Sequence, residues 1–390
     1  MKANPGGQID PKAMVGRDHL IQTLWETVAQ QSVVMTAERR IGKTTVMKRM
    51  QEEPPPGWVP VFQDLEGYHS AAEFAQSVYR EIHLFLTARK RVARRAQELF
   101  KVLGGTQIGG LFKLPEQEER RWKDVLTQSI EDLVRENDAE GTRLLFLWDE
   151  MPFMLSNIRD REGERTAMEV LDLLRALRMT HGDLRMIITG SIGLHHVLTS
   201  LRDKNYVNSP VNDMAKVDVP PLADDDAVTL ATLLIEGEQL STPDGPAAAK
   251  AIAREADQFP FYIHHVVKAL KVRDWTATPE HVAEVVALQL VDANDPWELQ
   301  HYRVRIPTYY HTDEKAVCLI LDQLATAPEA ATVDSLLAIL KSSSTFDDRE
   351  RLLRILELME RDHYLTRDVA GRYQFRFPLI RRWWKLKRGR

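Results

Sequence analysis

The stretch TAERRIGKTTVMKRM, Thr36–Met50, decides the fold because it joins a short apolar run to a helix through a glycine-containing loop. The run before it, SVVM at 32–35, has the character of a buried strand. The window Ala37–Thr44, AERRIGKT, matches the phosphate-binding pattern G-x-x-x-x-G-K-[ST] except at its first position, where alanine replaces glycine. Alanine is tolerable there if the backbone does not need a positive φ. We therefore interpret the window as a phosphate-binding loop.

The residue types of this loop suit phosphate groups. Gly42 lets the backbone approach a phosphate without a Cβ in the way, and the helix N-terminus supplies positive potential. Lys43 is placed to meet the β and γ phosphates of a nucleoside triphosphate as a catalytic residue, and Thr44 offers its hydroxyl to Mg²⁺. The residues expected to bind the nucleotide here are Ala37, Glu38, Arg39, Arg40, Ile41, Gly42, Lys43, Thr44 and Thr45.

A second apolar run, RLLFLWDE at 143–150, ends in two carboxylates. We expect Asp149 to hold Mg²⁺ together with Thr44, and Glu150 to orient and polarise the attacking water as the catalytic base. Because the carboxyl ends of parallel strands meet at one edge of a sheet, this strand end is expected to face the phosphate-binding loop.

A third run, LRMIITGS at 184–191, ends in hydroxyl-bearing side chains. We expect Thr189 and Ser191 to contact the γ-phosphate. Each of the three pieces alone is a weak signal, because Gly-Lys-Thr also starts ordinary helices and Asp-Glu also caps them. Together, in this order and each at a strand end, they predict a nucleotide site.

The composition is that of a globular protein, with 44% hydrophobic and 28% charged residues and a net charge of -5. No apolar run approaches the roughly 20 residues that a membrane-spanning helix needs. The single cysteine, Cys318, excludes an intrachain disulfide and fits a reducing compartment. We expect a cytoplasmic protein without membrane contact, and the 390 residues predict two or three domains.

The chain divides into four regions. Region 1–222 alternates strands and helices, which indicates a parallel sheet covered on both faces; its Gly-rich insertion at about 99–116 indicates a hairpin or a flexible segment. Region 223–292 is helical only and is interpreted as a lid, and 293–312 as a polar, Pro-containing linker. Region 313–390 has three helices followed by a strand, a Gly turn and a strand, the pattern of a winged helix. The predicted fold class is α/β: a P-loop NTPase sheet domain, an all-helical lid and a C-terminal winged-helix domain.

These pieces resemble the P-loop ATPases of the STAND and AAA-like group, in particular the archaeal and bacterial branch related to origin-recognition ATPases. The matching segments, which span nearly the whole chain, are VGRDHLIQTL, AERRIGKTT, LLFLWDE, IITGS, VPPLADDDAVTLATLL and YQFRFPLIRRWW. The resemblance implies ATP as the nucleotide, bound between the sheet domain and the lid, with Arg17 near the adenine. In STAND relatives a Gly-x-Pro of the lid touches the nucleotide; here the segment is Gln258-Phe259-Pro260, so only Pro260 is kept.

Phosphoryl-transfer enzymes often complete their site with an arginine. Arg202 follows the third strand, where related oligomeric ATPases place an arginine that reaches a neighbouring subunit. Arg254, on a lid helix, is positioned to contact the γ-phosphate of its own chain. Both are candidate catalytic residues, and a solvated surface arginine is the alternative for each.

Two functions stay open. In the favoured one, ATP closes the lid, slow hydrolysis reopens it, and the cycle gates binding of a partner protein or self-assembly. In the alternative, the winged helix binds duplex DNA, supported by residues 372–390, which carry eight Lys/Arg and no Asp/Glu. The third helix, 347–362, argues against DNA because it carries four arginines and six acidic residues and is therefore net acidic. A transcription regulator with a degenerate ATPase domain is a weaker third reading.

Overall fold

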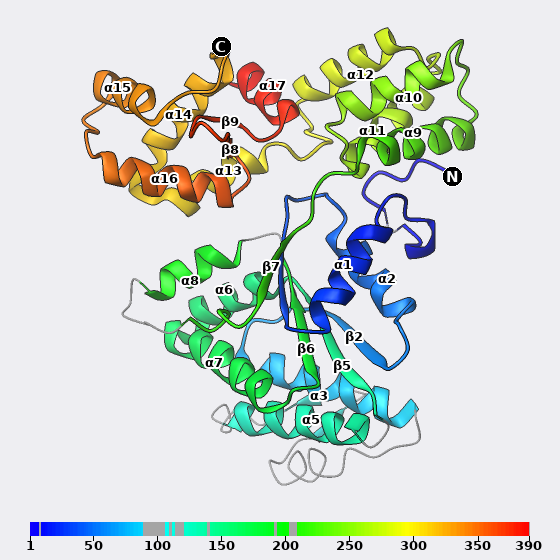
Figure 1. Ribbon diagram of the computed structural model, residues 1–390, viewed down its shortest axis with the longest axis vertical. Helices are drawn as coiled ribbons and strands as arrows, with labels where there is room; N and C mark the ends of the chain where they lie inside the picture. Colours follow the sequence, from blue (N-terminus) through cyan, green and yellow to red (C-terminus); the bar gives the residue numbers. More distant parts are fainter. Residues whose placement is uncertain are drawn as a thin grey trace. The chain divides into compact units, whose positions relative to one another are not determined.

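The computed structural model describes residues 1–7, 9–88, 106–108, 111–113, 121–138, 141–190, 193–202 and 209–389 (Figure 1). The chain forms two compact units. The sheet unit consists of Asp18–Thr36 and Lys43–Val219. The helical unit consists of Met1–Arg17, Ala37–Gly42 and Pro220–Arg390, so it includes most of the phosphate-binding window.

The sheet unit is built on five parallel strands in the order β2-β5-β6-β1-β7 (Figure 1). The three apolar runs described in the sequence form β1, β5 and β6, and β2 and β7 complete the sheet. The strands are β1 (Val33–Thr36), β2 (Trp58–Asp64), β5 (Arg143–Asp149), β6 (Leu184–Ile188) and β7 (Ala215–Asp218). The predicted parallel α/β sheet is confirmed.

Strand β5 shows why this sheet needs helices on both faces. Leu144, Phe146 and Trp148 point into one hydrophobic core, and the rings of Phe146 and Trp148 stack with centroids 4.9 Å apart. The intervening Leu145 and Leu147 are fully buried as well. Because successive side chains of a strand point to opposite faces, both faces of the sheet are covered.

The helices of the sheet unit connect these strands (Figure 1). Helices α3, α5, α6 and α7 contribute to the core that contains Trp148. The helices are α1 (Asp18–Val28), α2 (Lys43–Glu52), α3 (Ala71–Ala88), α5 (Trp122–Asp138), α6 (Met151–Glu162), α7 (Glu164–Thr180) and α8 (Leu194–Arg202).

The Gly-rich insertion contains a hairpin, as one of its two interpretations suggested. Strand β3 (Thr106–Ile108) pairs antiparallel with β4 (Leu111–Lys113). The remaining residues of the insertion lie outside the described residues.

The helical unit contains four helices where the lid was predicted, followed by those of the C-terminal regions. They are α9 (Asp224–Glu238), α10 (Gly245–Glu255), α11 (Pro260–Val272), α12 (Pro279–Val291), α13 (His301–Tyr310), α14 (Glu314–Thr326), α15 (Val333–Ser343), α16 (Arg349–Arg361) and α17 (Pro378–Lys387), with short 3-10 helices at Pro11–Ala13 and His311–Asp313. Side-chain caps start several of them: Asp244, Thr278, Thr332 and Asp348 each accept a hydrogen bond from the first turn.

The segment 293–312 differs from the prediction of a polar linker. It contains helix α13, which keeps Pro307 inside it and buries Tyr302, Ile306 and Tyr310. These three residues recur every fourth position and therefore share one face of the helix. The arginines between them and the proline masked this periodicity in the sequence.

Residues 313–390 form the elements predicted for them. Helices α14, α15 and α16 precede strand β8 (Leu365–Arg367), which pairs antiparallel with β9 (Tyr373–Phe375), and α17 follows. We call α14–α17 with this hairpin the C-terminal module. Helix α16 buries Leu352, Ile355, Leu356 and Met359.

Contacts of α17 join the C-terminal module to the predicted lid. Asp257, after α10, accepts a 2.6 Å hydrogen bond from the N–H of Leu379. The rings of Phe259 and Phe377 meet edge to face at 4.8 Å. The proposed boundaries at 222, 292 and 312 stay a prediction, but these residues belong to one packed unit.

Among the described residues, no helix has both the length and the apolar character needed to cross a bilayer.

Candidate functional site

In the sheet unit, the first turn of α2 meets the end of β5. Helix α2 begins at Lys43, which is buried. The hydroxyl of Thr44 donates a 2.5 Å hydrogen bond to Oδ2 of Asp149, and the N–H of Glu150 donates a 3.1 Å bond to Oδ1. The two motifs recognised separately in the sequence therefore form one cluster.

The electrostatics of this cluster centre on Asp149, whose side chain is 3% exposed. Burial raises the pKa of Asp149, the hydrogen bond from Thr44 lowers it, the charge of Glu150 raises it and that of Lys43 lowers it, with a net upward shift. The carboxylate would be stabilised by further positive charge beside it, which a divalent cation supplies.

The donor set of the cluster fits magnesium. Mg²⁺ prefers hard oxygen ligands and usually takes one or two carboxylates from a protein. Thr44 and Asp149 supply a hydroxyl and a carboxylate that already lie within hydrogen-bond distance. These two residues, which the sequence assigned to Mg²⁺, are the ones that would hold the ion.

Glu150 lies directly after β5 in a backbone conformation that non-glycine residues rarely adopt, with φ of 54°. The end of β6 lies against it. A Cβ on Gly190 would come within 2.7 Å of Pro152 Cδ and 3.3 Å of Glu150 Oε2, so this position needs glycine. The preceding residue, Thr189, is 1% exposed, and its Oγ1 has no hydrogen-bond partner among the described residues. A buried hydroxyl of this kind suits a bound water or ligand.

In the helical unit, the backbone of the loop explains the alanine at its start. Ala37 is not among the described residues with positive φ, whereas Arg40 (66°) and Gly42 (101°) are. The first position of the pattern therefore does not need glycine in this chain, and the sixth does.

Arg17 hydrogen-bonds the backbone of the loop. Its guanidinium donates a 3.0 Å hydrogen bond to the carbonyl of Ile41 and a 2.7 Å bond to that of Pro220. Burial lowers the pKa of Arg17 to about 10, while the charge of Asp226 acts in the opposite direction. A Cβ on Gly16 would come within 2.5 Å of Asp226. The structure thus gives Arg17 a contact with the phosphate-binding window, and its role toward an adenine stays a prediction.

The charged residues of the loop are held by residues near α13. Arg39 Nη2 lies 3.1 Å from Glu298, and Arg40 makes an ion pair with the same carboxylate. Glu38 is 3% exposed and faces Arg305 and His301. Burial raises the pKa of Glu38, but the charge of Arg305 and the nearby His301 outweigh burial and bring the pKa to about 2.

Gln258 and Pro260, in the segment predicted to be a lid, have well-defined backbone conformations. Gln258 has φ of 57°, which is glycine's usual territory. Pro260 is the first residue of α11, where a missing N–H costs nothing. The contact of Pro260 with a nucleotide stays a prediction.

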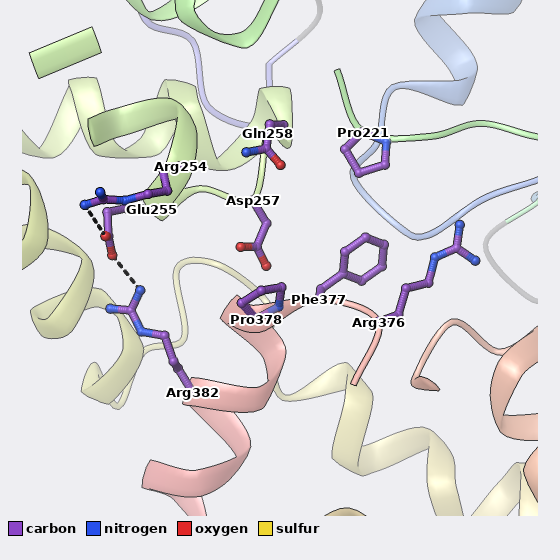
Figure 2. Close-up of a pocket in the computed structure, with 9 residues that line it drawn as sticks. All are labelled: Pro221, Arg254, Glu255, Asp257, Gln258, Arg376, Phe377, Pro378 and Arg382. Carbon is purple, nitrogen blue, oxygen red and sulfur yellow. Dashed lines mark hydrogen bonds and ion pairs between the residues drawn. The ribbon is translucent and has the colours of Figure 1, made fainter. Parts of the chain in front are cut away.

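Arg254 lines a pocket of about 440 Å³ between α10 and the start of α17, shown in Figure 2. Its guanidinium pairs with Glu255 at 3.1 Å, and Glu255 also pairs with Arg382 at 2.6 Å. Asp257 points into the same space beside Phe377 (Figure 2). The contact of Arg254 with a γ-phosphate stays a prediction.

Three other predicted residues are less informative. Thr45 lies in the first turn of α2 and is half-buried. Arg202 is the last residue of α8, but its side chain lies outside the described part of the chain. Ser191 lies outside the described residues.

Sequence reasoning missed Glu298, His301 and Arg305, which hold the loop. The one available signal was the density of basic residues in HYRVRIPTYY, 301–310, which is unusual for a linker.

Solved structures share this fold. The Walker-type ATPase paby2304 of Pyrococcus abyssi superposes with a TM-score of 0.64 at 16% identity, covering 96% of this chain and 97% of that chain. The ORC2 protein of Aeropyrum pernix, in its ADPNP-ADP complexes, gives a TM-score of 0.51 at 12% identity, covering 98% and 97%. No protein-family model and no curated protein matches the sequence. The chain has the fold of P-loop ATPases, of the kind found in ORC proteins, which confirms the resemblance at the level of the fold.

Proposed function

We propose that this protein binds ATP with Mg²⁺, hydrolyses it slowly, and uses the two nucleotide states as a switch that gates binding of a partner protein or of a second copy of itself. The observation that carries the proposal is the cluster of Lys43, Thr44, Asp149 and Glu150. A lysine, a hydroxyl and two carboxylates at the end of a parallel strand are the groups that ATP hydrolysis needs.

The roles follow from the chemistry of each group. In hydrolysis, the oxygen of water attacks the γ-phosphorus and the bond to the β–γ bridging oxygen breaks, which releases ADP and phosphate. Glu150 orients the water and accepts a hydrogen bond from it, and Lys43 stabilises negative charge on the phosphates. Mg²⁺ held by Thr44 and Asp149 supplies further charge neutralisation when bound. The buried Thr189 hydroxyl can donate to a phosphate oxygen or to the water.

The test uses two substitutions. Lys43→Ala should weaken binding of a labelled ATP analogue by about 100-fold, because it removes a charged hydrogen-bond donor. Glu150→Gln should keep that affinity and lower the turnover number by roughly 10²–10⁴. Lys48→Ala is the matched control: Lys48 lies on the same helix with its ammonium over the Phe62 ring at 5.8 Å. Competition with unlabelled GTP measures the preference for ATP.

The outcomes separate binding from catalysis. Normal hydrolysis by the Glu150→Gln protein would mean that another group is the base. Unchanged ATP affinity in the Lys43→Ala protein would refute the nucleotide site itself.

The contacts of the basic residues near the C-terminus, between 372 and 389, favour a protein partner over DNA. Of the seven basic side chains described between 372 and 389, five make contacts within the chain: Arg372 with Asp368, Arg376 with His363, Arg381 with the Ala325 and Ala327 carbonyls, Arg382 with Glu255, and Arg388 with Asp322. Affinity for DNA comes largely from cations that are available to phosphates. Three of these arginines are neutralised by carboxylates.

The net negative charge of α16 is a weaker argument against DNA binding in the structure than in the sequence. Asp348 caps the helix by accepting from the N–H of Arg351, and Asp362 at its end is buried and accepts from the Tyr310 hydroxyl. The buried Asp362 would not face a bound nucleic acid, so the repulsion expected from the sequence is weaker.

DNA binding is the second candidate, because Lys385 and Lys387 are exposed in the last turn of α17. It is tested by fluorescence anisotropy of a labelled duplex with the Glu150→Gln protein, with and without ATP, at two salt concentrations. Tight binding that requires ATP and weakens steeply with salt would establish it. Absence of binding in both states would leave the protein partner or self-assembly.

A further inference from the structure

The carboxylate of Glu38 connects the phosphate-binding window to helix α13. One oxygen, Oε1, accepts a 2.9 Å hydrogen bond from the N–H of Arg39, so it fixes the backbone of the loop itself. The same oxygen lies 3.7 Å from Arg305 Nη1 and 3.6 Å from His301 Nε2. Because the carboxylate is buried, its orientation depends on these partners.

Arg305 also contacts the C-terminal module. Its Nε donates a 2.8 Å hydrogen bond to the hydroxyl of Tyr364, and its Nη2 donates a 2.8 Å bond to the carbonyl of Asp362. Its guanidinium also lies over the Tyr364 ring at 4.5 Å. Asp362 ends α16 and Tyr364 precedes β8. A planar fork with several donors can hold a carboxylate on one side and two acceptors on the other, which lysine cannot do.

Tyr364 is held in place by a hydrogen bond to helix α13. Its hydroxyl donates a 2.6 Å hydrogen bond to the carbonyl of Tyr302, on α13, and its side chain is fully buried. The loop, helix α13 and the C-terminal module are therefore linked through the Arg305 guanidinium, which makes an ion pair with Glu38 on the loop and hydrogen bonds with Tyr364 and Asp362 in the module.

A second contact ties the same two segments together. Arg40 in the loop pairs with Glu298, just before α13. Both residues have positive φ, 66° and 55°, which side-chain-bearing residues rarely adopt. Such conformations persist when the surrounding contacts impose them, and they concentrate at functional sites.

We propose that Arg305 is a positioning residue for the phosphate-binding loop, and that through the path Glu38–Arg305–Tyr364 the C-terminal module and the nucleotide site are energetically coupled. The inference rests on the proposed nucleotide binding and adds the route by which the switch is read out. Linkage makes the coupling reciprocal: a partner that moves the C-terminal module changes nucleotide affinity, and the nucleotide changes partner affinity by the same factor.

The experiment measures the affinity of the full chain for a fluorescent ATP analogue. Tyr364→Phe removes only a hydroxyl, outside the loop, and should weaken binding about fivefold. Tyr373→Phe is the matched control, since Tyr373 is a buried tyrosine of β9, in the same module, and lies off the path. Arg305→Lys keeps the positive charge but loses the fork, and should weaken binding at least as much. Thermal unfolding confirms that each variant is folded at the assay temperature.

A double-mutant cycle separates coupling from general destabilisation. In a Glu38→Gln background, Tyr364→Phe should have no further effect on the affinity, because the path is already broken. An unchanged affinity in both Tyr364→Phe and Arg305→Lys, or effects of Glu38→Gln and Tyr364→Phe that simply add, would overturn the proposal. If the unmodified protein binds no nucleotide, the proposed function fails first, and that result is distinct from binding that the variants leave unchanged.

Discussion

The hydroxyl of Thr44 donates a 2.5 Å hydrogen bond to Oδ2 of Asp149, which joins the helix after the phosphate-binding loop to the end of a central strand. These two residues come from separate motifs, and their contact brings together the groups that we assign to magnesium. The buried Asp149 lies near Lys43 on one side and Glu150 on the other, so the cluster has both charge signs within one small volume.

The first prediction concerns magnesium. Thr44→Ala removes the hydroxyl donor and one proposed ligand, so it should weaken binding of Mg²⁺–ATP about tenfold. Binding of ATP in EDTA should change little. Titrations with and without Mg²⁺ measure both quantities. Thr166→Ala is the control, because the hydroxyl of Thr166, on α7, donates to the carbonyl of Glu162 at the end of α6 and lies outside the cluster. Equal losses in Mg²⁺ and in EDTA would contradict the assignment of Thr44 to the metal.

The second prediction concerns the two ends of the loop pattern. Ala37→Gly restores the consensus residue but should not raise nucleotide affinity, since Ala37 does not adopt a positive φ. It should cost stability, by about 0.5 kcal/mol, through the entropy of the unfolded chain. Gly42→Ala should weaken nucleotide binding, because φ of 101° strains any side chain there. Affinity and thermal unfolding of the two variants check this, and a gain in affinity with Ala37→Gly would show that the loop lacks its glycine.

The third prediction tests the contact between β6 and Glu150. Gly190→Ala places a Cβ within 2.7 Å of Pro152, a rigid ring in the turn that carries Glu150. Displacement of the proposed base should lower the turnover number about tenfold or more and change ATP affinity little. Gly182→Ala is the control, because a Cβ there meets nothing within 4 Å. Loss of affinity without loss of turnover in the Gly190→Ala protein would place Glu150 outside the catalytic step.

The parts of the site that the sequence predicted are those that depend on local patterns. Lys43 and Thr44 follow a loop of fixed length, and Asp149 ends an apolar strand, so chain order and strand parallelism suffice to bring them together. The residues that hold the loop could not be found this way. Arg40 and Glu298 are 258 positions apart, and their pairing depends on how helices pack rather than on any local period.

One local interpretation failed for a physical reason. Pro307 and the polar residues around it suggested a linker, but the segment forms helix α13, whose Tyr302, Ile306 and Tyr310 are buried. Burial of this face stabilises the helix against the cost of its proline. Here tertiary contacts override the preference of a single residue.

The last prediction concerns pH and Asp257, which joins α10 to α17. Burial raises the pKa of Asp257 to about 6, against the opposing effects of the Leu379 N–H and Arg382, and Glu255 adds to the rise. The folded state therefore holds this proton more tightly than the unfolded state, whose value is near 3.8. The Asp257 carboxyl therefore contributes to the free energy of unfolding in full below about pH 4. As the pH rises to 6, this contribution of about 2–3 kcal/mol is lost.

Asp257→Asn keeps an oxygen that accepts from Leu379 but cannot ionise. We expect the variant to gain stability relative to the unmodified protein as pH rises from 4.5 to above 6.5, because only the unmodified protein loses the contribution of this carboxyl over that range. The comparison uses the difference between the two proteins at each pH, which cancels the opposite contribution of His264 and His265, whose pKa values burial lowers to about 4. Denaturant unfolding at the two pH values measures this difference. A gap that is the same at both would show that the carboxyl does not titrate between them, and that its hydrogen bond to α17 stabilises the unit in the charged form.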